Sequence, residues 1–221
     1  LFGFAEAGYL RCRRRLRKPS TGGAGRRSTE KYLFAGIVPA GRMYDLCKED
    51  LRINFHTMRT GIFYGSTTGM TESLAAKIAA RTGVAQTDVH NVADASADEA
   101  EGYDLLLLGS STWGCGELQD DWYDFLDALK RKALSGKRVA LFGCGDSASY
   151  PDSFCDALSE IRDGLEATGC TFVGALDAAE YDGCTSRICR DGKVIGLAVD
   201  DGASEAVSDA RMEKWIAAVG F

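Results

Sequence analysis

Histidine is scarce in this chain of 221 residues, with only His56 and His90. Two imidazoles argue against a His-rich metal site and against a Ser-His-Asp hydrolase. The eight cysteines show no CxxC pair and no zinc-ligand spacing, so we expect mostly reduced thiols and a cytoplasmic protein. No run of 18 or more apolar residues is present, so we expect no transmembrane helix.

Basic residues are also in short supply after residue 57. Residues 58–221 hold 14 Lys and Arg against 27 Asp and Glu, a net charge of −13, whereas residues 1–57 carry +7. Contacts to nucleic acid and to anionic membranes need Lys and Arg, so the acidic part argues against both partners. The contrast divides the chain into an extension, 1–57, and one domain, 58–221, which is long enough for one buried core.

The extension is expected to be disordered or not native. Its segment 11–27 combines a basic run with Gly, Ser and Pro and shows no sustained helical or strand period. The first strand-like run begins directly after Met58, which favours Met58 as the natural start. Two alternatives are a transit-type presequence, weakened by five acidic residues, and a basic nucleic-acid-binding arm.

From residue 60 the pattern alternates between strands and helices. Apolar runs such as 104–109 and 137–143 are typical of strands buried on both faces. Such alternation predicts an α/β fold with a parallel sheet covered by helices on both faces. The predicted strands are Thr60–Tyr64, Thr87–Val92, Asp104–Gly109, Lys137–Gly143, Thr171–Val173 and Ile195–Val199. The predicted helices are Glu72–Arg81, Asp120–Lys130, Ser153–Thr168 and Glu205–Val219, the last with Val207, Met212, Trp215 and Ile216 facing the core.

Ligands of parallel sheets bind at the carboxyl ends of the strands, so the loops after residues 64, 109 and 143 are candidate binding loops. The first loop, Ser66-Thr67-Thr68-Gly69-Met70-Thr71, is rich in hydroxyls and precedes a helix N-terminus, which suits a phosphate. It lacks the GxxxxGK[ST] of a triphosphate loop, and GxGxxG is missing, so a single monophosphate fits better. A Ser/Thr-rich helix cap is the alternative.

Aromatic residues mark the other two loops. Trp113 lies in Ser111-Thr112-Trp113-Gly114-Cys115-Gly116, where neighbouring glycines favour an exposed ring over one packed under a helix. Tyr150 ends the run Cys144-Gly145-Asp146-Ser147-Ala148-Ser149-Tyr150, which is also compatible with an ordinary turn in which Asp146 bonds its own backbone. Together the three loops predict a site for a flat ring carrying a short phosphorylated tail.

Three segments, GIFYGSTTGMTE, GSSTWGCGELQDDW and FGCGDSASYPDSF, resemble the signature segments of flavodoxins, which are small FMN electron carriers. The match runs from about residue 59 to 219, and the interruption 174–194 resembles the insertion of long-chain flavodoxins. The resemblance implies a five-stranded parallel sheet of order 2-1-3-4-5. It also implies that the FMN phosphate binds to the first loop, at Ser66, Thr67, Thr68, Gly69, Met70 and Thr71. The isoalloxazine ring would stack between Trp113 and Tyr150. The remaining residues that line the ring would be Ser111, Thr112, Gly114, Cys115, Cys144, Gly145 and Asp146.

The resemblance implies a low-potential one-electron carrier that is a monomer and not an enzyme. Its partners would be redox proteins, reductases and oxidoreductases, docking on an acidic rim. Glu117, Asp120, Asp121, Asp124, Asp146 and Asp152 are the acids near the site in sequence. Gly114 would let the turn 113–116 change conformation as the flavin is reduced. Cys184 and Cys189 lie within the interruption, and we expect free thiols there because four intervening residues permit pairing only if the chain turns.

Two other functions fit the same fold. An FMN-dependent quinone or NADPH reductase would need a pocket for its second substrate, and the sequence shows no extra basic site for a nicotinamide phosphate. A receiver-type signalling domain would need an acidic pair after the first strand, where this chain has GSTTG.

Overall fold

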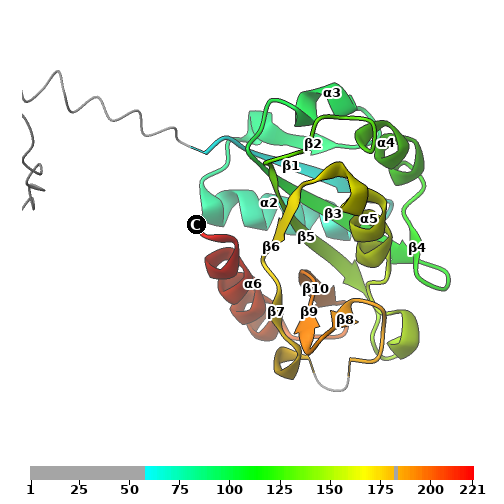
Figure 1. Ribbon diagram of the computed structural model, residues 1–221. Coiled ribbons are helices and arrows are strands. Elements are labelled where there is room, and N and C mark those ends of the chain that lie inside the picture. The colour runs from blue at the N-terminus through cyan, green and yellow to red at the C-terminus, as the bar shows by residue number, and fades with distance from the viewer. Residues whose placement is uncertain (1–57, 182–183) are drawn as a thin grey trace, which may run out of the picture. The chain divides into compact units, whose positions relative to one another are not determined.

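The computed structural model describes residues 58–181 and 184–221 (Figure 1). The predicted extension, 1–57, lies outside the described residues. Within the described residues, no helix is both long and apolar enough to cross a membrane.

A parallel sheet forms the centre of the described chain. Its path is β2 (Val89–Asn91), β1 (Thr60–Gly65), β3 (Leu105–Trp113), β5 (Arg138–Gly145) and β10 (Leu197–Asp200). Each neighbouring pair on this path is parallel. A further strand, β6 (Thr171–Val173), pairs in parallel with the start of β5, while β10 pairs with its end. The predicted order 2-1-3-4-5 is therefore confirmed, with the fifth position shared by two short strands.

The segment between β6 and β10 forms a small sheet of its own. β7 (Leu176–Asp177) and β8 (Cys189–Arg190) each pair antiparallel with β9 (Lys193–Val194). Cys184 and Cys189 form a disulfide with their Cα atoms 6.3 Å apart, so the prediction of free thiols is wrong at these two positions. The turn that pairing requires is present, because the Cys189 amide donates to the Ser186 carbonyl at 3.0 Å.

Helices cover both faces of the sheet (Figure 1). Three ion pairs join α2 (Met70–Thr82) to α6 (Glu205–Val219): Lys77 to Glu205, and Arg81 to both Asp209 and Glu213. The other layer contains α3 (Ala97–Ala100), α4 (Trp122–Leu129) and α5 (Ala157–Leu165), and α4 contacts both α3 and α5. In α4 the predicted apolar face is confirmed, because Trp122, Phe125, Leu126 and Leu129 are all buried.

The core lies along the two central strands. Leu105 to Leu108 of β3 and Val139 to Phe142 of β5 are fully buried, as the continuous apolar runs predict. Gly109 leaves room for the Phe142 ring, since a Cβ at Gly109 would lie 2.2 Å from that ring. The last residues of β3 and β5 are partly exposed and lie at the carboxyl edge of the sheet.

Several predicted boundaries differ from the structure. The strand predicted from Thr87 begins at Val89, because Gln86–Asp88 forms a 3-10 turn. The helix predicted from Ser153 begins at Ala157, since Cys155 has a φ of 55° that interrupts helical backbone. Val207 was expected in the core and is 43 % exposed, on the first turn of α6. The short elements α3 and β4 (Glu117–Leu118) were not predicted.

Candidate functional site

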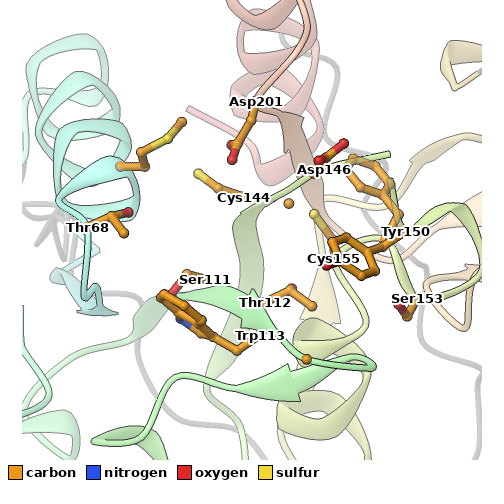
Figure 2. A pocket seen from close by; sticks show the side chains of 14 residues that line it. Thr68, Ser111, Thr112, Trp113, Cys144, Asp146, Tyr150, Ser153, Cys155 and Asp201 are labelled. Carbon is orange, nitrogen blue, oxygen red and sulfur yellow. The ribbon is translucent and has the colours of Figure 1, made fainter. Parts of the chain in front are cut away.

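A cleft of about 270 Å³ lies at the carboxyl ends of β1, β3 and β5, where the sequence predicts the site. Figure 2 shows Trp113 below the opening and Tyr150 to its right, with Thr68 at the left and Asp201 at the top. Ten of the fifteen predicted residues line the cleft: Thr68, Met70, Ser111, Thr112, Trp113, Gly114, Cys144, Gly145, Asp146 and Tyr150. Ser66, Thr67, Gly69, Thr71 and Cys115 do not line it.

The first loop ends in an open helix N-terminus. Gly69 is the residue before α2 and adopts a φ of 87°, which glycine tolerates without strain. Its amide donates to Ser66 Oγ at 3.1 Å, which folds the loop back on itself. No side chain caps the first turn of α2, so that turn offers its N–H groups and the positive end of the helix dipole to an anion.

The second loop is a tight turn between β3 and β4. The Gly116 amide donates to the Trp113 carbonyl at 3.0 Å, and Gly114 has a φ of 51°. Gly114, the first central residue of the turn, has a positive φ, and Cys115, the second, does not. This combination matches a type II′ turn. Trp113 is 43 % exposed, and its Nε1 donates to Ser111 Oγ at 3.0 Å, which orients the ring. The sequence-based expectation of an exposed Trp113 is confirmed.

The third loop carries the other exposed ring. Tyr150 is 57 % exposed. Asp146 Oδ1 accepts the amides of Ala148 at 3.0 Å and Ser149 at 2.9 Å, the local turn that the sequence allows as an alternative. Hydrogen bonds from the side chain and amide of Ser149 hold the pKa of Asp146 below its usual value. Asp146 is therefore ionised at neutral pH and places a negative charge on the cleft.

Comparison with known proteins identifies the family. The flavodoxin family model matches residues 62–215. Flavodoxin 1 of Salmonella typhimurium is 46 % identical over 158 residues, which cover 71 % of this chain and 90 % of that protein. Flavodoxin 1 of Escherichia coli K12 is 45 % identical over the same coverage. The chain belongs to the flavodoxin family.

Solved structures agree with this assignment. The flavodoxin of Fusobacterium nucleatum, solved bound to flavin mononucleotide, superposes with a TM-score of 0.64 at 29 % identity, over 72 % of this chain and 96 % of that one. A mutant of the same flavodoxin, also bound to flavin mononucleotide, gives a TM-score of 0.65 at 29 % identity, over 73 % of this chain and 95 % of that one. The flavodoxin-like fold predicted from the sequence is thereby confirmed.

Four residues that line the cleft were not predicted: Ser153, Phe154, Cys155 and Asp201. A signal existed for Asp201, because it follows β10 directly and the strand-end rule applies to every parallel strand of the sheet. Burial, with repulsion from Asp200 and Asp146, raises the pKa of Asp201 above its usual value. No sequence pattern marks Ser153, Phe154 and Cys155. Their loop is held by hydrogen bonds from Ser186 and Arg187, about 30 residues further along the chain.

Two buried thiols line the cleft. Burial raises the pKa of Cys144 to about 12 and raises that of Cys155 well above its ordinary value. Both therefore remain protonated and unreactive at neutral pH. Cys115 is exposed and lies outside the cleft lining.

One polar atom in the cleft lacks a partner. Thr112 Oγ1 is buried and makes no hydrogen bond within the described chain. Buried hydroxyls are normally paired, so a ligand with a polar group at this depth would satisfy it. A second cleft of about 530 Å³ shares Thr68, Met70, Cys144 and Asp201 with the first and continues between α2 and α6.

Proposed function

We propose that this chain binds FMN non-covalently in the cleft and serves as a low-potential one-electron carrier between redox enzymes. The observation that carries the proposal is the meeting of an uncapped helix N-terminus with two exposed aromatic rings at one cleft. Membership of the flavodoxin family and two flavodoxin structures bound to flavin mononucleotide support it. FMN supplies the redox chemistry when bound, and the protein sets its environment.

The residues present fit the chemical parts of FMN. The first turn of α2 and the hydroxyls of Ser66, Thr67 and Thr68 provide donors for a phosphate, without the lysine that a triphosphate needs. Thr71 is assigned through its backbone N–H alone, because its side chain is fully buried. Trp113 and Tyr150 provide flat faces for the ring system. The unpaired Thr112 hydroxyl provides a polar contact inside the cleft. We also assign Gly69, Met70, Ser111, Gly114, Cys144, Gly145 and Asp146 to this site, and Cys115 to its outer edge.

Charge favours a low potential. Of the six acids expected near the site from sequence, Asp146 lines the cleft, and Asp201 adds a second carboxylate. One negative charge about 10 Å away in water opposes an added electron by roughly 0.4 kcal/mol. Two such charges lower the potential by about 35 mV, since about 1.4 kcal/mol corresponds to about 59 mV for one electron.

The turn at Gly114 provides a device for separating the two one-electron steps. Its peptide can change orientation because Gly114 already has a positive φ of 51° and glycine also adopts negative values. Replacing Gly114 by Val restricts that change, and a Cβ there also meets Glu117 Oε2 at 2.6 Å. We expect Gly114→Val to bring the two reduction potentials closer together in a redox titration. An unchanged separation would contradict this role.

Redox partners are proposed to dock on the acidic rim around the cleft. Glu117, Asp120 and Asp152 are exposed on the segments that border it. Transient complexes of this kind form fast and weaken as salt increases. We propose a cytoplasmic monomer. Four free cysteines among the described residues are typical of a reducing compartment, whereas the Cys184–Cys189 disulfide is not. Size-exclusion chromatography tests the oligomeric state.

One experiment separates the carrier from an enzyme of the same fold. The purified FMN-loaded protein is mixed with NADPH, alone and with a catalytic amount of a flavoprotein reductase. A carrier is reduced only when the reductase is present, and its rate falls with added salt. Steady oxidation of NADPH by the protein alone, or with a quinone, would favour a reductase instead.

A further inference from the structure

Gln119 lies between two of the three binding loops and is almost completely buried, with 4 % of its surface exposed. Its backbone amide donates to Ser110 Oγ at 3.3 Å, at the end of the buried part of β3. Its side-chain Nε2 donates to Thr67 Oγ1 at 3.4 Å, in the loop after β1. A buried amide that joins these loops without itself lining the cleft is suited to positioning rather than to direct ligand contact.

The orientation of the Gln119 amide is fixed by its neighbour Asp121. The backbone N–H of Asp121 can only donate, and it donates to Gln119 Oε1 at 3.1 Å. The Asp121 carboxylate can only accept when ionised, and its Oδ2 accepts from Gln119 Nε2 at 2.7 Å. One N–H of the amide is thus used by Asp121, and the other is directed at Thr67.

This arrangement controls the direction of the Thr67 hydroxyl. A hydroxyl has one proton to donate and an oxygen that accepts. Because Thr67 Oγ1 accepts from Gln119, the proton of Thr67 remains available to a ligand. Thr67 is exposed and lies three residues before the first turn of α2, so its free proton adds to the donors offered there.

We propose that Gln119 is a positioning residue that sets the selectivity for the phosphate of the cofactor, by holding the Thr67 hydroxyl as a donor toward an anion. The inference rests on the proposed function, because the anion is the FMN phosphate. It predicts that Gln119 matters for FMN and not for riboflavin, which has the same ring and ribityl chain without the phosphate.

The test measures FMN and riboflavin dissociation constants of the flavin-free protein by quenching of flavin fluorescence. Gln119→Met removes the amide at similar volume and should weaken FMN binding about tenfold, with riboflavin binding unchanged within about twofold. Equal losses for the two flavins, or no loss for FMN, would overturn the proposal.

Thr67→Val gives a second route that does not disturb a buried position. It should reproduce the FMN-specific loss, and adding Gln119→Met to it should cause no further loss, since both act through one hydroxyl. Additive losses in the double variant would contradict the proposal.

Ser186→Ala is the matched control. It removes a buried hydrogen bond to the Phe154 carbonyl on the other side of the cleft, and it should leave the ratio of the FMN and riboflavin dissociation constants unchanged. If the unmodified protein binds neither flavin, the proposed function itself fails.

Discussion

The two sides of the cleft are held in different ways. The β1–β3 wall, residues 65–71 and 110–119, follows directly from central strands and is fastened by the buried Gln119. The Tyr150 wall, residues 146–156, leaves β5 and is fastened by the insertion. There Ser186 Oγ donates to the Phe154 carbonyl at 2.8 Å, and the Arg187 amide donates to Asp156 Oδ1 at 2.8 Å. The first wall is fastened by one of its own side chains, and the second by a segment about 30 residues further along the chain.

The disulfide closes the segment that holds the Tyr150 wall. Cys184 and Cys189 flank Ser186, Arg187 and Ile188, and Ser186 and Ile188 are buried. Thr185 Oγ1 adds a third link, to Asp152 Oδ1 at 3.0 Å. The proposed phosphate loop and Trp113 therefore share one support, while Tyr150 has another, and the two supports can be weakened one at a time.

The largest expected difference between the two walls is in the cost to stability of replacing the glycines that end β1 and β5. A Cβ at Gly65, in the β1–β3 wall, would lie 2.5 Å from both Gln119 Oε1 and Trp122 Cδ1, which are buried and fixed. At Gly145, at the end of β5, the nearest atoms are 3.2 Å away. We expect Gly65→Ala to lower the free energy of unfolding by about 3 kcal/mol and Gly145→Ala by about 1 kcal/mol. Urea unfolding checks both, and equal costs would contradict the difference in packing.

Opening the disulfide should loosen the Tyr150 wall alone. Loop closure over six residues corresponds to about 2 kcal/mol of stability. We therefore expect Cys184→Ser to lower the free energy of unfolding by about that amount and to weaken FMN and riboflavin equally, since the phosphate loop is untouched. Cys170→Ser changes a free cysteine and is the control that should cost much less. A loss confined to FMN would show that the two walls are coupled.

The exposed rings can be removed with little effect on folding. Trp113 and Tyr150 are each about half exposed, so Trp113→Ala and Tyr150→Ala should change stability little. Each should weaken both flavins by about 1 to 2 kcal/mol through lost stacking. Flavin titrations of the two variants measure this. A ring whose removal leaves affinity unchanged does not contact the flavin.

The smallest expected effect is a pH dependence at Asp201. Its pKa is raised, mainly by burial, so the folded protein binds this proton more tightly than the unfolded chain does. Stability therefore falls as pH rises through the raised pKa and stays lower above it. Asp201→Asn should raise stability at neutral pH and leave it nearly unchanged at acidic pH, where the carboxyl is protonated in both states.

Asp177 provides the control with the opposite sign. A hydrogen bond from the Ala179 amide, followed by the charge of Lys193, lowers the pKa of Asp177, so its ionised form stabilises the fold. Asp177→Asn should lower stability slightly at neutral pH. Thermal melts of the parent protein and both variants between about pH 2 and pH 7 give the stability change caused by each substitution. The two changes should vary with pH in opposite directions, and variation in the same direction would contradict these assignments.

The sheet and the position of the first loop were predictable because their signals are local. Continuous apolar runs mark β3 and β5, and hydroxyls before a helix mark the first loop. The Tyr150 wall was predicted only in part. The left-handed Cys155, the disulfide and the contacts of Ser186 bring together residues far apart in sequence, and no period or spacing predicts them. Asp201 was missed because the strand-end rule was applied to three strands and not to β10.

The most direct test of the account is a titration of the flavin-free protein with FMN, followed by absorbance after gel filtration. The account predicts one FMN retained per chain, with the visible absorbance of bound flavin, and two separate one-electron steps on reduction. A protein that stays colourless after gel filtration, or that retains riboflavin as tightly as FMN, would contradict it.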